Sequence, residues 1–162
     1  MRIGIGAQLG IVGGPATYAS ELARALARLG GQGGHDYVVF TDRPDAFDGA
    51  GVETVSVPLP TTYHQVVWDH ATLPGLLRRH GVALYHGTKG IRPFRCPVPA
   101  VVTVHDLAVY AFPETFALPQ RWHFRLCVPP SVARSARVIA DSAHARATTW
   151  SRASASRASA SV

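Results

Sequence analysis

Apolar residues along the chain follow two alternating spacings, one typical of strands and the other of helices. Ile3 and Ile5 stand at every second position and predict a strand over residues 1–7. Between residues 16 and 29, apolar side chains recur every three or four positions, as on one face of a helix. Gly30 and Gly31 then predict the end of that helix. The chain therefore opens with a strand, a glycine-rich loop and a helix.

The same alternation continues along the chain. Short apolar segments predict further strands over residues 37–40, 52–57, 83–86, 101–104 and 138–140. Helical spacing returns at residues 65–80, where Pro74 either kinks the helix or opens a shorter one, and at about 119–135, where Pro129 and Pro130 interrupt it. This alternation predicts an α/β fold: an open, Rossmann-like, mostly parallel sheet with helices on both faces.

The last residues differ in kind from the rest. Residues 151–162 contain the sequence Ser-Arg-Ala-Ser-Ala twice, and no large apolar residue occurs there before Val162. Such a repeat has little apolar surface with which to form a core. We therefore expect a single domain over residues 1–150, followed by a disordered tail over residues 151–162.

Composition narrows the class of protein. The 162 residues are 47% hydrophobic and 16% charged, which suits one globular domain and excludes general disorder. The two cysteines, Cys96 and Cys127, make no disulfide framework, and no secretory signal opens the chain. No apolar run approaches the ~18 residues of a membrane-spanning helix. A cytoplasmic location is the expectation.

Charge is unevenly distributed. The formal net charge is +6, and residues 82–162 hold 10 Lys and Arg against 3 Asp and Glu. A basic half of this kind keeps a nucleic-acid-binding protein open as an alternative. However, 15 of the 16 basic residues are arginine, and Arg152 and Arg157 fall in the expected tail. Nucleic acid is therefore not the partner that we expect.

The loop after the first strand is the first candidate site, because ligands of open parallel sheets bind outside the carboxyl ends of the strands. Gly13 and Gly14 precede the first helix, where backbone N–H groups attract a phosphate. A tight turn without a ligand is the alternative. A dinucleotide-binding fingerprint fits poorly, because Gly4 and Gly6 lie inside the strand.

Two further candidate groups follow later strands. His105 and Asp106 come directly after residues 101–104, so an imidazole and a carboxylate are available at a strand end. Thr88 and Lys89, the only lysine, lie between glycines after residues 83–86. A buried histidine bonded only within the fold and a lysine surrounded by solvent are the respective alternatives.

Other sites are not predicted. No Cys-x-x-Cys or His-Glu-x-x-His sequence occurs, so no metal site is expected at His123, at Cys127 or elsewhere. The chain also lacks the Gly-x-Ser-x-Gly elbow of esterases and the phosphate-binding loop of nucleotide hydrolases.

Four segments occur in a familiar order. They are Gly13-Gly14 followed by Tyr18, Leu84-Tyr-His-Gly87, Val101-Val-Thr-Val-His-Asp-Leu107, and Ala136-Arg-Val-Ile-Ala-Asp-Ser142. Together they resemble the amino-terminal half of family 4 glycosyltransferases of the GT-B fold. The resemblance covers residues 1 to about 150. It implies a retaining transfer of a hexosyl group from a nucleotide-sugar to an acceptor hydroxyl, with no metal or other cofactor.

The resemblance also implies roles for the candidate residues. The family's active site is a cleft between two Rossmann-like domains, and the amino-terminal domain mostly binds the acceptor. His105 would be the catalytic contact to the transferred sugar. The remaining residues would bind donor or acceptor: Gly13 and Gly14 at the donor phosphates or the acceptor, Asp106 at the turn, Thr88 and Lys89 on the acceptor side, and Ser142 at the cleft floor.

The chain departs from the family pattern in lacking the carboxyl-terminal, donor-binding domain. That domain would supply charged groups that stabilise the departing diphosphate, so we expect little or no turnover from this chain alone. We interpret the chain as an incomplete or frame-shifted reading of a longer gene. A stand-alone sugar- or nucleotide-binding module, or half of a split enzyme, is the alternative.

The expected partners follow from the same resemblance. They are a nucleotide-sugar, a glycan or lipid-linked acceptor, and a missing or separately encoded donor domain. Arginines within residues 119–137 also raise peripheral contact with the inner face of a membrane, although solvated helix charges explain them equally well.

Overall fold

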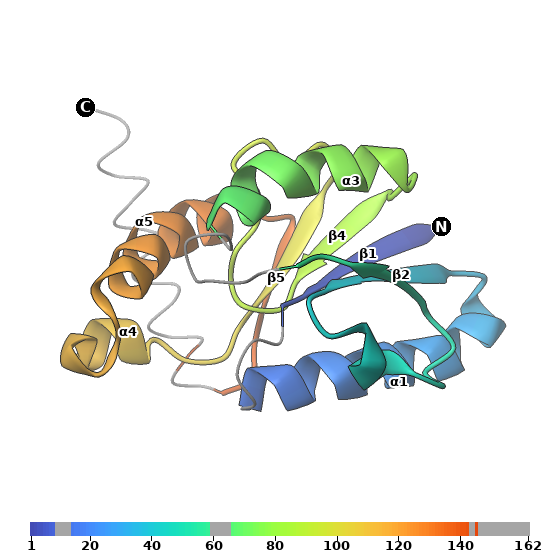
Figure 1. Cartoon of the computed structure of the whole chain (residues 1–162), viewed down its shortest axis with the longest axis horizontal. Helices are drawn as coiled ribbons and strands as arrows, with labels where there is room; N and C mark the ends of the chain where they lie inside the picture. Colours follow the sequence, from blue (N-terminus) through green and yellow to red (C-terminus); the bar gives the residue numbers. More distant parts are fainter. Residues whose placement is uncertain (9–13, 59–65, 143–144, 146–162) are drawn as a thin grey trace.

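The computed structural model describes residues 1–8, 14–58, 66–142 and 145, and places a six-stranded sheet between helical layers (Figure 1). The strand order is β3-β2-β1-β4-β5-β6, and every pair is parallel. The strands are β1 (Arg2–Ala7), β2 (Asp36–Thr41), β3 (Glu53–Ser56), β4 (Leu84–Gly87), β5 (Ala100–Val104) and β6 (Arg137–Ala140). The predicted Rossmann-like α/β fold is confirmed.

The strand order reverses between β1 and β4, which lie side by side in the middle of the sheet. Two glycines allow close packing there. A Cβ on Gly6 would overlap the Tyr85 hydroxyl, and a Cβ on Gly87 would overlap the carbonyl oxygen of Ile91. In open parallel sheets, ligands bind outside the carboxyl ends of the strands at such a reversal, which in this sheet lies between β1 and β4.

One face of the sheet is covered by α1 (Gly14–Gly33), with the 3₁₀ helix η1 (Pro44–Phe47) beside it. Ala19 and Ala23 of α1 pack on Ile5 and Val39 in a fully buried cluster. Small alanines bring the helix close to the strands, so the start of α1 is fixed near the carboxyl end of β1.

The opposite face is covered by the π-helix η2 (Trp68–Thr72), α3 (Leu73–Arg79) and α5 (Leu118–Arg134) (Figure 1). Leu73 and Leu77 are fully buried against Phe40. Farther along the sheet, α5 packs on Val102. Two short helices, α4 (Ala108–Ala111) and η3 (Pro113–Thr115), connect β5 to α5.

The predicted end of the first helix at Gly30 and Gly31 is wrong, because α1 continues to Gly33. Gly30 is buried against Tyr37, whose ring would lie 2.8 Å from an added Cβ. The glycine therefore serves helix–strand packing. The helix ends where Gly34 adopts a φ of +64° and its N–H donates to the Gly30 carbonyl over 2.9 Å.

The predictions made from proline positions have different outcomes in the two helical segments. Pro74 opens the short helix α3, which was one of the two alternatives. Pro129 and Pro130 do not interrupt α5, which runs through both. Prolines inside a helix cost about 3 kcal/mol each, but Val128 and Val132 on either side are buried against the sheet and hold the helix to it.

Several predicted features lie outside the described residues, namely the tail over 151–162, the first residue of the segment 65–80, and Gly13. Among the described residues, no helix is long and apolar enough to cross a membrane.

Candidate functional site

A buried threonine joins the carboxyl ends of β1 and β4. Thr88 directly follows β4, and its Oγ1 donates to the Gly6 carbonyl of β1 over 2.6 Å. The hydroxyl is thus used inside the fold, while the backbone of Thr88 forms part of the site. The predicted contact of Thr88 with an acceptor stays a prediction.

His105 follows β5, and three neighbours fix its ring. Its Nδ1 lies 3.0 Å from Asp141 Oδ2, and its Nε2 lies 2.9 Å from the carbonyl oxygen of Thr88. The ring of Tyr18 meets it edge-to-face with centroids 4.6 Å apart. Only 15% of the His105 side chain is exposed, so the ring has one orientation.

Both ring nitrogens of His105 therefore face acceptors. The two contacts hold the ring from both sides, and the side chain borders the pocket described below.

A second histidine lies behind the first. His86 in β4 has its Nε2 2.8 Å from Thr103 Oγ1, which is also 3.1 Å from the Tyr18 hydroxyl. Burial, together with the charge of His105, lowers the pKa of His86 to about 4. His86 is therefore a neutral link that joins β4, β5 and α1 beneath the site.

Asp106 stands just before α4, and Ser142 follows β6. Asp106 Oδ1 accepts from the N–H of Ala108 over 2.9 Å and fixes the turn into α4. Ser142 Oγ accepts from the N–H of Ala145 over 3.0 Å, which is the spacing of a helix N-cap. Both side chains are exposed, and their ligand roles stay predictions.

Lys89 projects from the loop between β4 and β5. Burial lowers the pKa of its ammonium, and the carboxylates of Asp42 and Asp69 act in the opposite direction. The next residue, Gly90, has a φ of +72°, a conformation that favours glycine. The loop therefore turns sharply after Lys89, whose side chain lines the pocket described next.

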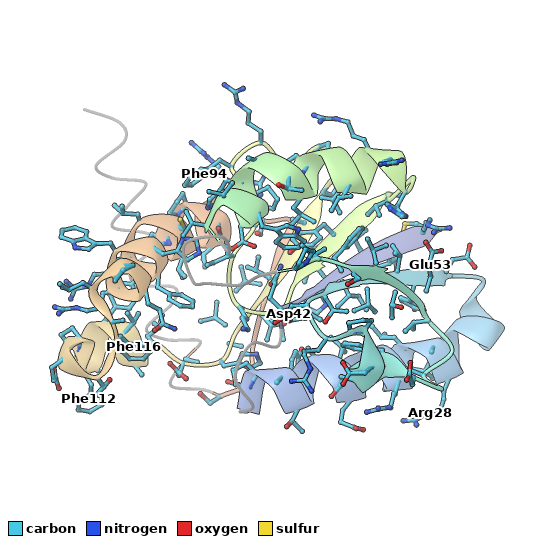
Figure 2. All side chains as sticks on the ribbon, viewed as in Figure 1. Arg28, Asp42, Glu53, Phe94, Phe112 and Phe116 are labelled. Carbon is cyan, nitrogen blue, oxygen red and sulfur yellow. The ribbon has the colours of Figure 1, made fainter. Side chains whose placement is uncertain are left out.

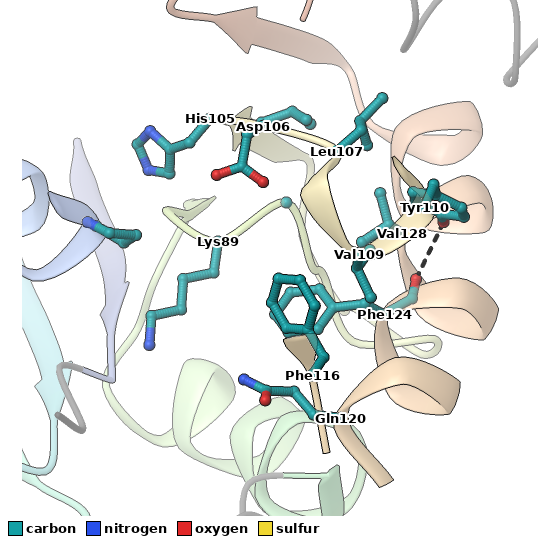
Figure 3. Close-up of a pocket in the computed structure, with 13 residues that line it drawn as sticks. Lys89, His105, Asp106, Leu107, Val109, Tyr110, Phe116, Gln120, Phe124 and Val128 are labelled. Carbon is teal, nitrogen blue, oxygen red and sulfur yellow. Dashed lines mark hydrogen bonds between the residues drawn. The ribbon is translucent and has the colours of Figure 1, made fainter. Parts of the chain in front are cut away.

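A pocket of about 220 Å³ lies beside these groups (Figure 3). Lys89, His105 and Asp106 reach it from the strand ends, and Pro15 reaches it from the first turn of α1. Gly14, next to Pro15, is exposed, and an added Cβ would meet no atom within 4 Å. The described part of the chain thus gives no packing reason for a glycine at position 14.

The opposite wall of the pocket is helical and was not predicted. Gln120, Phe124 and Val128 follow one another at four-residue steps along α5, and Tyr110 and Phe116 complete the wall (Figure 3). The Tyr110 hydroxyl donates to the Phe124 carbonyl over 3.3 Å, which ties α4 to α5. The four-residue spacing was the available signal, but it is also that of a helix packed on a core.

Taken together, the pocket has polar side chains, the Lys89 ammonium among them, on its strand side and aromatic rings on its helix side. An ammonium group at the carboxyl ends of parallel strands suits an anionic ligand, and an aromatic wall suits the apolar face of a sugar or a lipid. Of the sequence-predicted residues, the structure brings Lys89, His105 and Asp106 to one pocket. Ser142 and Thr88 do not line it.

Comparisons with known proteins bear on the fold and on the family of the chain. The fold is similar to that of Alr3699/HepE from Anabaena, whose crystal structure contains UDP and glucose: the TM-score is 0.60 at 19% sequence identity, over 94% of this chain. The chain spans only 41% of the HepE chain. No curated protein matches. The family model described as Glycosyltransferase Family 4 matches residues 12–159, and the chain therefore belongs to glycosyltransferase family 4.

Proposed function

We propose that this chain is the acceptor-binding half of a retaining glycosyltransferase that moves a hexosyl group from a nucleotide-sugar to an acceptor hydroxyl. The observation that carries the proposal is the pocket at the strand ends, where Lys89, His105 and Asp106 meet an aromatic wall. Family membership supplies the reaction class. The half-enzyme role is supported by the 41% coverage of HepE.

Positive charge is what the departing nucleotide diphosphate requires. In the proposed reaction the bond between the sugar and the diphosphate breaks, and negative charge develops on the phosphate oxygens. Lys89 and His105 border the pocket, and the Lys89 ammonium can stabilise that charge. Because Asp141 and Thr88 fix the ring of His105, little reorganisation is needed when the charge develops.

Asp106 and the helical wall suit the sugar and the acceptor. One oxygen of Asp106 holds the turn into α4, and we assign the other to a sugar hydroxyl. Phe116 and Phe124 offer aromatic surface to the apolar face of a glycan or to a lipid-linked acceptor. Gln120 supplies a neutral amide at the same wall.

Donor binding by a second domain is not part of the function that we propose for residues 1–162. We infer that residues 1–162 alone bind ligand without turnover, because Lys89 supplies only part of the charge that the departing diphosphate requires and a donor-binding domain would supply the rest. HepE was crystallised with UDP and glucose, so UDP-sugars are the first donors to test. We also propose that the transfer itself requires no metal ion.

The experiment is calorimetric titration of the purified chain with UDP, UDP-glucose, GDP and GDP-mannose. We expect binding of at least one diphosphate, weakened at least tenfold in Lys89→Met and in His105→Ala. Arg78→Met, an exposed change on α3, is the matched control and should bind as the wild type does. Absence of binding to every nucleotide, or equal binding by the three variants, would overturn the proposed site.

Two controls separate the remaining alternatives. A nucleic-acid-binding protein would bind duplex DNA with a steep dependence on salt concentration, and we expect no such binding. Turnover by the chain alone, measured as release of free UDP with and without a chelator, would contradict the half-enzyme role.

The outer face of α5 supports peripheral membrane contact. Leu118, Trp122 and Leu126 lie four residues apart and are 64%, 62% and 62% exposed. Arg121 and Arg125 lie on the same helix. Apolar residues beside arginines suit an anionic lipid surface, and the same helix forms a wall of the pocket. We therefore propose that this face, the α5 outer face, contacts the membrane that carries a lipid-linked acceptor.

A further inference from the structure

Four side chains that can carry charge or bind a metal meet between η2 and α5, outside the pocket. They are Asp69 and His70 of η2 and His123 and Cys127 of α5, and three of the four are buried. Cys127 Sγ lies 3.3 Å from His70 Nε2 and 3.5 Å from His123 Nδ1. The three candidate ligand atoms all lie within 4.8 Å of one another. None of these side chains lines the pocket.

The two sulfur–nitrogen distances are those of a tetrahedral metal site. Zinc binds cysteine sulfur at about 2.3 Å and histidine nitrogen at about 2.0 Å, so two such ligands at a tetrahedral angle lie about 3.5 Å apart. The observed 3.3 and 3.5 Å agree with this separation. One thiolate with two imidazoles also selects zinc over the oxygen-preferring cations magnesium and calcium.

We propose that His70, His123 and Cys127 bind a zinc ion that fastens η2 to α5. The site is independent of the proposed glycosyl transfer, because its ligands face the interior beneath α5. Three protein ligands leave a fourth position for a water molecule.

An outer layer of hydrogen-bonding groups supports this assignment. Asp69 Oδ2 lies 3.4 Å from His123 Nε2, the ring nitrogen that does not face the sulfur. That nitrogen is buried and has no hydrogen bond of good geometry. A metal on Nδ1 places the proton on Nε2, facing the carboxylate, which is the carboxylate–histidine–metal arrangement of many zinc sites. Gln8 Nε2 donates to the other oxygen of Asp69 over 3.4 Å and orients it.

His70 must exchange one contact when the metal binds. Its Nδ1 now accepts from the N–H of Phe94 over 3.3 Å. A metal on Nε2 places a proton on Nδ1, so the N–H of Phe94 has to turn toward solvent. Phe94 is 48% exposed, and only one long hydrogen bond is lost. The stacking of Phe94 on His70, with centroids 4.1 Å apart, does not depend on that bond.

The test is a titration of the chelator-treated full chain with Co²⁺, followed by displacement with Zn²⁺. We expect one Co²⁺ per chain and the near-ultraviolet absorption of a cobalt–thiolate bond, both removed by one equivalent of Zn²⁺. The absorption should vanish in Cys127→Ser. It should persist in the matched control Cys96→Ser, which removes the other cysteine.

Two further variants guard against loss of fold. His70 is only partly buried, so His70→Gln should fold, and it should lower zinc affinity at least tenfold. Asp69→Asn should lower it roughly 10- to 100-fold through the outer layer. Zinc should raise the melting temperature of the wild type and of Cys96→Ser only. No thiolate absorption in the wild type, or unchanged zinc affinity in folded His70→Gln, would overturn the proposal.

Discussion

His105 and Asp141 join the ends of two neighbouring strands through a contact of 3.0 Å between Nδ1 and Oδ2. His105 follows β5 and Asp141 follows β6, and 44% of the Asp141 side chain is exposed. The other ring nitrogen, Nε2, donates to the carbonyl oxygen of Thr88, so the two contacts together fix the ring. Asp141 therefore acts on the pocket without lining it.

This relationship predicts the effect of Asp141→Asn. The amide keeps the size of the side chain but replaces the charged acceptor at His105 Nδ1 by a weaker, neutral one, so the ring is held less firmly. We expect nucleotide diphosphate affinity to fall roughly three- to tenfold, measured calorimetrically at neutral pH. Stability should change by less than about 1 kcal/mol, because the pair is partly exposed. Asp36→Asn, an exposed acid at the start of β2, is the control. Equal affinities in wild type and Asp141→Asn would contradict this role.

The neutral state of His86 predicts a dependence of stability on pH. Its pKa is about 4 in the folded protein, against 6.5 as the ordinary value. Between these values the unfolded chain binds more protons, so stability is full above pH 6.5 and decreases as the pH falls toward 4. The expected loss from this group is about 2 kcal/mol by pH 5.

The measurement is urea unfolding of wild type and His86→Gln at pH 7.5 and 5.0. Glutamine can still bond to Thr103 but does not titrate, so the variant should lose less stability on acidification than the wild type. His35→Gln changes an exposed histidine and should follow the wild type. A parallel loss in His86→Gln and wild type would show that His86 is not the group responsible.

Two glycines differ in the space around them, which predicts opposite outcomes when each is replaced by alanine. In Gly6→Ala the new methyl group would overlap the Tyr85 hydroxyl, and we expect a loss of about 1–3 kcal/mol. In Gly14→Ala the methyl group meets no atom within 4 Å, and stability should be unchanged or slightly higher. Urea unfolding compares the two.

A double variant tests the cause assigned to the loss at Gly6. Tyr85→Phe removes the hydroxyl that would overlap the methyl group, so Gly6→Ala should cost less in the Tyr85→Phe background. Recovery should be partial, since the ring carbon Cζ lies 3.0 Å from the added Cβ. An equal cost in both backgrounds would locate the strain elsewhere.

Local structure could be predicted from the sequence more completely than tertiary contacts. The period of apolar residues predicted every strand to within two residues at each end, because side-chain alternation is a local property. The predicted end of α1 was wrong, because Gly30 packs against Tyr37, a contact that exists only in the folded chain.

The residues of the candidate site also differ in whether the sequence could predict them. Lys89, His105 and Asp106 could be predicted because each follows a strand, and strand ends of a parallel sheet meet at one edge. Asp141 as the partner of His105 depended on β6 lying next to β5.

The cluster around Cys127 could not be predicted. The cysteine stands 57 residues from His70, and the four-residue step from His123 to Cys127 is by itself that of any helix. The expectation that no metal site occurs was based on residue spacing within single segments, whereas the fold brings two distant segments together.

The α5 outer face yields the last prediction. Leu118→Ser combined with Trp122→Ser removes two exposed apolar side chains without touching the buried side of the helix. In vesicle flotation with anionic phospholipid, we expect the wild type to bind and this variant to bind at least tenfold more weakly.

Charge is tested separately on the same helix. Arg121→Gln should weaken binding to anionic vesicles roughly fivefold, the effect of about 1 kcal/mol per basic residue at such a surface. Leu29→Ser removes a 60% exposed leucine from α1, on the other side of the sheet, and should bind as the wild type does. Equal binding to anionic and zwitterionic vesicles, or a loss in Leu29→Ser as large as that in the α5 variants, would mean that this face does not direct membrane contact. A selective loss in the α5 variants would place the membrane beside the helix that carries Gln120 and Phe124, so that a lipid-linked acceptor could reach the pocket from that side.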